Sequence, residues 1–346
     1  MFDELTQKEK NAVKEMAKVL IDYSSESQMR KILDNLELLE TLSYQFGEKV
    51  EPFDEEELEY HEYYTFEDII VLVKKFLGTI DPEYPVKFDE LLNDGTINLY
   101  HIDDEEYVDI YGEDAFCIED DIPKYDENGT IIGFEKRRDI NVPLQHTLDD
   151  AYSLIHEFIH YTNIPNGIEY SDDRDILTES SSFIFECLFN KYLIDNGYSK
   201  EEADINLKMR INTSIELAES VNGIAGVLLY MKNYPDYIKE AVPYDKEDSS
   251  EYEAILDEID YFLAGVISLM AYKNYLDGKI DIKNIKDFNS ALEFNDNLES
   301  LIFLFGHRIE ECDVEQICED ISSIINELGI SRKIKSANLL SIFLSS

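Results

Sequence analysis

The sequence predicts a mostly α-helical protein of the α+β class, in which a small antiparallel β-sheet precedes the central helices. Apolar residues recur at the three- and four-residue spacing of helices before residue 95 and again from residue 147. Between these regions, residues 96–143 contain short β-type runs separated by turn residues. We therefore expect an N-terminal helical region at 1–95 and a larger domain at 96–346, whose helical part spans 147–346.

The composition excludes several classes of protein. Of the 346 residues, 44% are hydrophobic and 31% are charged, which is typical of a globular chain rather than a disordered one. The 76 acidic residues exceed the 30 basic ones and give a net charge of −46. Because such a surface repels nucleic acids and anionic membranes and attracts cations, we expect no nucleic acid and no membrane as partner.

The N-terminus and the cysteines indicate a cytoplasmic protein. The segment from Met1 to Leu5 contains acids and no basic residue, so we expect no signal peptide. No run of 18 apolar residues occurs, so no membrane span is expected. The cysteines form no Cys-x-x-Cys pair, which fits a reducing compartment; they lie at positions 117, 187, 312 and 318.

The N-terminal region is expected to form helices on either side of an acidic connector. Thr65 followed by Asp68 predicts a capping box at the start of the helix that follows the connector. Pro82 and the residues after it end that helix, because proline cannot donate a backbone hydrogen bond. The expected helices are 6–23, 26–46, 69–80 and 86–92.

The sheet region is expected to contain short strands at 96–101, 107–111, 115–118, 130–134 and 139–142. The pair Asn128-Gly129 predicts a turn between two of them. Because the last strand, Asp139 to Val142, leads directly into the helical part, we expect it to border the functional cleft. As an edge strand it could pair with an extended peptide.

From residue 147 onward the pattern predicts helices. Gly278 and Gly329 fit the left-handed position that ends a helix. The apolar segment 333–345 is expected to pack as a C-terminal helix or strand. The expected helices are 147–162, 174–195, 200–231, 249–277, 284–304 and 313–328.

The first of these helices carries the sequence His156-Glu157-Phe158-Ile159-His160. On a helix the two histidines lie on one face, one turn apart, so both imidazoles can bind a single Zn²⁺. Glu157 can then act as general base toward a zinc-bound water. The chain contains only six histidines, so a chance pair at this spacing would be unusual.

Glu179 is the expected third metal ligand. It lies 19 residues after His160, and the turn residues between them predict a second, antiparallel helix. With His156 these residues would leave one zinc position open, whereas a purely structural zinc prefers four Cys or His ligands. Three further residues have spacings that suit orientation of the ligands, or simple capping and solvation, and these are Asp149, Ser182 and Glu186.

Around these residues the sequence resembles the thimet oligopeptidase and oligoendopeptidase F family of zinc peptidases, nearest the oligoendopeptidase F branch. Residues 147–160 resemble the metal helix of the family, and the stretch from Glu179 to Glu186 resembles its third-ligand helix. The stretch Tyr261-Phe262-Leu263-Ala264-Gly265 resembles its tyrosine-bearing helix. The resemblance covers approximately residues 130–290.

The resemblance implies a helical, zincin-like catalytic domain of the gluzincin group that hydrolyses oligopeptides and uses Zn²⁺ as its cofactor. It also implies a tyrosine or histidine that stabilises the oxyanion. Tyr261 is the expected donor; Tyr252 is an alternative, and ordinary core packing also explains Tyr261. The sequence departs from the family in having Ile159 where glycine is usual, and in lacking most of the N-terminal helical half.

Two functions stay open from the sequence alone. The first is a zinc metalloendopeptidase that acts on neutral or cationic oligopeptides. The second is a catalytically weak or inactive metallopeptidase-like binding protein. Glu157 favours the first, because a decayed site does not need its general base, while the shortened N-terminal half favours the second.

Overall fold

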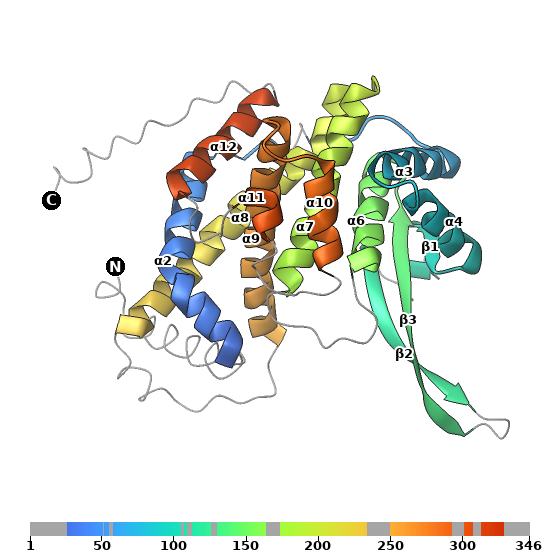
Figure 1. Ribbon diagram of the computed structural model, residues 1–346, viewed down its shortest axis with the longest axis horizontal. Coiled ribbons are helices and arrows are strands. Elements are labelled where there is room, and N and C mark those ends of the chain that lie inside the picture. The colour runs from blue at the N-terminus through green and yellow to red at the C-terminus, as the bar shows by residue number, and fades with distance from the viewer. Residues whose placement is uncertain are drawn as a thin grey trace. The chain divides into compact units, whose positions relative to one another are not determined.

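The computed structural model describes residues 26–50, 52–54, 58–104, 107–108, 113–125, 130–163, 174–233, 250–292, 301–306 and 313–328. These residues are mostly helical and include one three-stranded sheet, which confirms the predicted fold class (Figure 1). In chain order the elements are α2 (Glu26–Lys49), α3 (Phe66–Ile80), α4 (Tyr84–Asp94), β1 (Ile97–His101), β2 (Phe116–Tyr125), β3 (Ile131–Leu144), α6 (Asp149–Asn163), α7 (Arg174–Asp195), α8 (Lys200–Asn233), α9 (Ser250–Leu276), α10 (Ile282–Ala291), α11 (Ile302–Phe305) and α12 (Val314–Glu327).

The chain divides into two compact units, each assembled from separate segments. Unit 1 comprises Met1–Pro52, Asn212–Ile259 and Cys312–Ser346, and in it α2 packs against α12. Unit 2 comprises Phe53–Ile211 and Asp260–Glu311. The border between residues 95 and 96 that the sequence predicts falls inside unit 2, so a functional division at that position stays a prediction.

Unit 2 is organised around a hydrophobic core that includes most of the apolar residues of α6. The ring centroids of Phe88 and Phe158 lie 5.6 Å apart, and those of Tyr152 and Phe189 lie 4.8 Å apart. Complete burial of an aliphatic or phenylalanine side chain stabilises a fold by roughly 1.5–3 kcal/mol. Helix α6 is therefore fixed on several sides; its buried apolar residues are Ala151, Tyr152, Leu154, Ile155, Phe158 and Ile159.

Capping residues explain where α3 begins and where α4 begins and ends. The hydroxyl of Thr65 accepts a hydrogen bond from the backbone N–H of Asp68, and the carboxylate of Asp68 accepts one from the N–H of Thr65. This confirms the predicted capping box, with α3 starting at Phe66. Helix α4 has a proline in its first turn and ends at Gly95, whose φ of 80° suits glycine.

The sheet has the strand order β1-β3-β2 and mixed pairing. Strand β2 is antiparallel to β3, as predicted, but β1 is parallel to β3, with Ile97 opposite Ile140 and His101 opposite Leu144. Strand β3 is thus central, so the prediction that its segment Asp139 to Val142 forms an edge is wrong. Strand β1 pairs with β3 from Ile140 to Leu144 and takes up hydrogen-bonding groups that a peptide would need.

The outer parts of the sheet also differ from expectation. The two short strands expected at 130–134 and 139–142 form the single strand β3, and β2 extends beyond its expected end to Tyr125 (Figure 1). Tyr107 and Val108 are helical rather than extended, because their backbone N–H groups donate to the carbonyl of Asp104. The turn at Asn128-Gly129 lies outside the described residues.

The remaining helices follow their predicted ranges closely, and α7 matches its range of 174–195. The helix expected over 284–304 is described as α10 and α11, and Gly278 has the left-handed φ of 70° that its position after α9 requires. The helix expected at 6–23, the segment 333–345 and Gly329 lie outside the described residues. Within the described part of the chain, no helix has both the length and the apolar character needed to cross a membrane.

Candidate metal centre

Helix α6 carries the central side chains of the candidate site, and its start is fixed by polar contacts. The carboxylate of Asp150 accepts hydrogen bonds from the backbone N–H groups of Gln145 and His146, at 2.9 and 2.8 Å. The hydroxyl of Thr147 accepts one from the N–H of Asp149 at 3.3 Å. The contact of Asp149 satisfies a donor that the helix N-terminus leaves unpaired, and the contacts of Asp150 tie the preceding residues to the first turn of the helix that presents His156.

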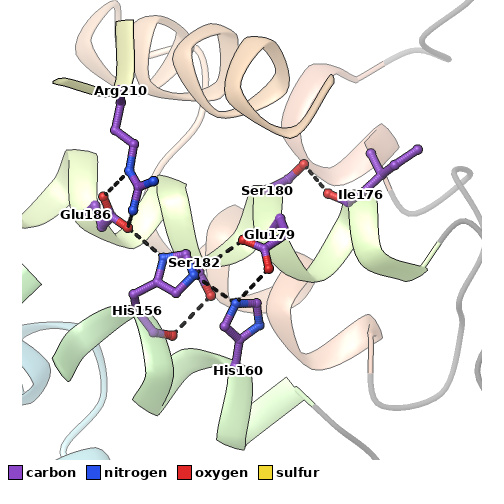
Figure 2. A network of polar contacts seen from close by, with 8 residues as sticks. All are labelled: His156, His160, Ile176, Glu179, Ser180, Ser182, Glu186 and Arg210. Atoms are coloured by element: carbon purple, nitrogen blue, oxygen red, sulfur yellow. Dashed lines mark hydrogen bonds and ion pairs between the residues drawn. The ribbon is translucent and has the colours of Figure 1, made fainter. Parts of the chain in front are cut away.

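Helix α7 packs against α6 and carries three consecutive buried serines that bond to three different elements. The hydroxyl of Ser182 donates to the backbone carbonyl of His156 at 3.1 Å, and that of Ser181 donates to Asn289 of α10 at 2.6 Å. Ser180 satisfies itself within the helix by donating to the carbonyl of Ile176 (Figure 2). Small side chains at this interface allow the two helices to approach closely, which brings Glu179 to the histidines.

His156, His160 and Glu179 converge at one point between α6 and α7 (Figure 2). The two Nε2 atoms lie 2.8 Å apart. The carboxylate of Glu179 reaches the Nε2 atom of His160 at 3.1 Å and that of His156 at 3.3 Å. Ligand atoms that share a tetrahedral zinc at about 2.0–2.1 Å are separated by roughly 3.3 Å, so the three side chains that the sequence indicates are placed as one ligand set.

The charges around this point fit a bound cation. Glu179 and Glu186 are buried carboxylates whose pKa values burial raises. The imidazoles of His160 and His156 outweigh burial and hold the pKa of Glu179 below its usual range, and Arg210 and His156 do the same for Glu186. One oxygen of Glu179 is buried without a hydrogen-bond partner among the described residues. When the histidines are neutral, the negative charge of Glu179 and Glu186 exceeds the positive charge of Arg210. A divalent cation would offset this excess of negative charge.

The protonation of His156 leads to the same conclusion. Burial lowers its pKa, yet hydrogen bonds to Glu179 and Glu186 outweigh burial and raise the pKa to about 10. A proton on His156 supplies positive charge where a bound metal ion would supply it. A metal binding at this point would release that proton, as expected when imidazole changes from an acid to a ligand.

Glu186 and Arg210 support His156 from the side opposite the convergence point. The Nδ1 atom of His156 lies 2.6 Å from an oxygen of Glu186, so its N–H donates to that carboxylate and Nε2 is free to face Glu179. Arg210 of α8 donates to both oxygens of Glu186 at 2.8 and 2.7 Å. The guanidinium also lies over the ring of Phe183, 4.1 Å from its centroid.

Glu157 is positioned differently from the residues that surround it. It is 7% exposed and forms no hydrogen bond or ion pair with any residue that the structure describes. Burial is the main cause that raises its pKa, and the charges of His156 and His160 partly oppose the rise. A carboxylate with a raised pKa and no fixed partner among the described residues has the properties expected of a general base.

Tyr261 of α9 lies on the Phe183 side of the site. Its ring is 6.3 Å from that of Phe183, which in turn is 5.2 Å from the imidazole of His156. Tyr261 is 44% exposed, so it is not an ordinary core residue. Its role as an oxyanion donor stays a prediction, and the side chain of the alternative, Tyr252, lies outside the described residues.

The three residues that the sequence suggested as orienting groups make different contacts in the structure. Glu186 and Ser182 contact His156, but Asp149 accepts from the hydroxyl of Tyr60 at 3.4 Å instead. Arg210 was not indicated by the sequence, because it lies 24 residues beyond Glu186 on another helix. A buried glutamate that must pair with a cation is the one signal that could have directed attention to it.

Comparison with known proteins supports the fold of a peptidase. No family model matches the chain, and no curated protein matches it. The structure is similar to the crystal structure of a provisionally named peptidase from Chlamydophila abortus, with a TM-score of 0.52 and 16% identity. A provisionally named oligoendopeptidase F from Bacillus anthracis strain Ames aligns with a TM-score of 0.47 and 16% identity.

These alignments include most of this chain and only part of the other proteins. They cover 90% and 89% of this chain, but 57% of the Chlamydophila abortus protein and 58% of the Bacillus anthracis protein. The chain therefore spans less than three fifths of the length of either protein. The likeness to the Chlamydophila abortus structure shows a shared fold. The convergence of His156, His160 and Glu179 is observed in this chain.

Proposed function

We propose that this protein is a zinc-dependent metallopeptidase that hydrolyses peptide bonds in oligopeptides. The observation that carries the proposal is the convergence of His156, His160 and Glu179 beside the buried Glu157, which has no polar partner among the described residues. Two imidazoles and one carboxylate are the ligands of a catalytic zinc, which keeps a further position open for substrate. The peptidase fold of a structural neighbour is consistent with this function.

Each group has a separate task in the proposed reaction. A Zn²⁺ ion held by His156, His160 and Glu179 would supply Lewis acidity to the scissile carbonyl and to water. The carboxylate of Glu157 accepts a proton from the attacking water and delivers it to the nitrogen of the departing amine. The hydroxyl of Tyr261 donates to the carbonyl oxygen as negative charge develops on it.

Glu157→Gln tests the proposal directly. Glutamine has nearly the same shape but cannot accept the proton, so kcat for a fluorogenic peptide library should fall by about 10²–10⁴-fold. Metal analysis should give one tightly bound zinc per chain in both proteins, and a chelator should abolish the activity of the wild type. Glu202→Gln is the matched control, since Glu202 is equally buried but accepts from the backbone N–H of His61.

Three results would contradict the proposal. A wild type without zinc would exclude the metal, and a Glu157→Gln protein with full activity would exclude the general base. A zinc-loaded wild type that cleaves no peptide in the library would favour the alternative, a metallopeptidase-like binding protein.

The preferred substrates are proposed to be neutral or cationic oligopeptides. The net charge of −46 places the site in a negative potential that attracts positive peptides and is screened by salt. We expect kcat/KM for a Lys-rich peptide to exceed that of a matched Glu-rich peptide at low ionic strength, with the difference shrinking as salt is added. A preference for the Glu-rich peptide at low salt would contradict this expectation.

A further inference from the structure

A second pair of histidines lies in contact outside the candidate metal centre. His101 ends strand β1, and His146 lies between β3 and α6. The Nδ1 atom of His101 is 3.0 Å from the Nε2 atom of His146, and the ring centroids are 4.9 Å apart. The corresponding values for His156 and His160 are 2.8 and 4.6 Å, so the two pairs have similar spacings, although their ring planes are inclined by 40° and 68°.

The hydrogen bonds of His146 fix which of its nitrogens is free to bind. Its Nδ1 atom lies 3.1 Å from the backbone carbonyl of Tyr64, and because a carbonyl only accepts, Nδ1 must carry the hydrogen. The lone pair of Nε2 therefore faces His101. A histidine that binds a metal almost always donates its other N–H to a carbonyl or carboxylate, and His156 has this arrangement with Glu186.

The backbone of His146 is held in an unusual conformation by contacts that also orient its ring. Its φ of 62° is left-handed, and no other residue except glycine has a positive φ in the described part of the chain. For a residue with a Cβ this conformation is unfavourable, because the Cβ comes close to the backbone carbonyl oxygen. It is maintained by the hydrogen bond to Asp150, by the N–H of Tyr64 donating to its carbonyl at 2.9 Å, and by the stacked ring of Tyr63 at 5.0 Å.

We propose that His101 and His146 form a second site for a divalent transition-metal cation, of which Zn²⁺ is the example to test. Neutral imidazole nitrogens suit zinc, copper and nickel. His101 is exposed and can present its Nδ1 lone pair by moving its hydrogen to Nε2, and the acidic surface attracts cations to it. The proposal is independent of the peptidase function.

The second site should bind more weakly than the first. Among the described residues no third histidine, cysteine or carboxylate converges with this pair, so water would complete the coordination. A cation there would link the end of β1 to the residues that precede α6. It would thus join two segments that are 45 residues apart in the sequence.

Equilibrium dialysis of the full-length chain against Zn²⁺, followed by metal analysis, tests this site. The proteins are the wild type, His101→Ala, His146→Asn and the control His61→Ala, which removes an exposed histidine without a ring partner in the described structure. We expect the wild type and His61→Ala to bind a weaker equivalent in addition to any tight one. In the two pair variants that equivalent should be lost or its affinity reduced at least tenfold.

Two features keep this test decisive. Asparagine tolerates a positive φ, so His146→Asn should remain folded, and melting curves in the absence of metal verify this for both variants. The weak equivalent of the wild type should also be lost on acidification, because a protonated imidazole cannot bind a metal. Absence of a second equivalent in the wild type, or its undiminished presence in both pair variants, would overturn the proposal.

Discussion

The two histidine pairs of unit 2 have similar contacts but different surroundings. His156 and His160 lie on one helix, nearly buried, next to the carboxylates of Glu179 and Glu186. His101 and His146 come from a strand end and a loop, and the acceptor behind them is a backbone carbonyl. The difference teaches that contact between imidazoles can arise in two ways, and that charge and burial decide how strongly such a pair binds a cation.

The buried pair should be much the more sensitive to substitution. His156→Ala removes a ligand and the one imidazole that contacts both Glu179 and Glu186, so the tight zinc should be lost. Activity should fall by more than the roughly 10²–10⁴-fold that one acid–base group contributes. Metal analysis and peptide hydrolysis measure both effects, and an unchanged zinc content would show that the buried pair is not a ligand set.

The next largest effect is expected at Tyr261, which faces the buried pair across Phe183. Tyr261→Phe keeps the ring but removes the donor, so kcat should fall by about 10–10³-fold. Zinc content and melting temperature should stay close to those of the wild type. If Tyr261→Phe is fully active and Tyr252→Phe is not, the donor is the alternative tyrosine; if both are active, the donor lies elsewhere.

Glu186→Gln measures what a charged acceptor adds to the buried pair. The amide can still accept from Nδ1 of His156, but it lacks the negative charge that also pairs with Arg210. Loss of such an outer partner should lower zinc affinity by about 10–100-fold. Competition with a chelator measures this change, with Glu202→Gln as the control, and equal affinities would mean that Glu186 only packs.

The last effect concerns the pH dependence of stability rather than metal binding or activity, and it comes from Asp149 at the start of α6. Burial is the main cause that raises the pKa of Asp149 to about 6, partly opposed by Arg210. Because the folded state holds this proton more tightly than the unfolded state, the stabilisation is complete below about pH 4 and is lost as the pH rises through about 6. A shift of two units corresponds to about 3 kcal/mol.

Asp149→Asn removes this dependence, since an amide does not ionise. Between pH 4 and pH 7 the variant should lose less free energy of unfolding than the wild type, by up to about 3 kcal/mol. Denaturant unfolding at a series of pH values measures the difference. Parallel curves for the two proteins would show that Asp149 titrates normally.

Local sequence determined the helices and the placement of His156 and His160 on one helix face. The capping box of Thr65 and Asp68, the range of α7 and the shared face of His156 and His160 all depend on residues within a few positions of each other. Helix periodicity fixes such relations before any tertiary contact forms. Glu179 could also be indicated, because turn residues follow the first helix in the sequence and predict a second, antiparallel one.

Only the tertiary structure decided the relations between distant segments. The parallel pairing of β1 with β3, the support of His156 by Arg210 and the contact of His101 with His146 each join residues on different elements. No periodic pattern records such pairs, because they depend on how the core of unit 2 brings helices and strands together. The sequence therefore determined which residues could bind a cation. Packing determined that Arg210 supports His156 through Glu186 and that His101 meets His146.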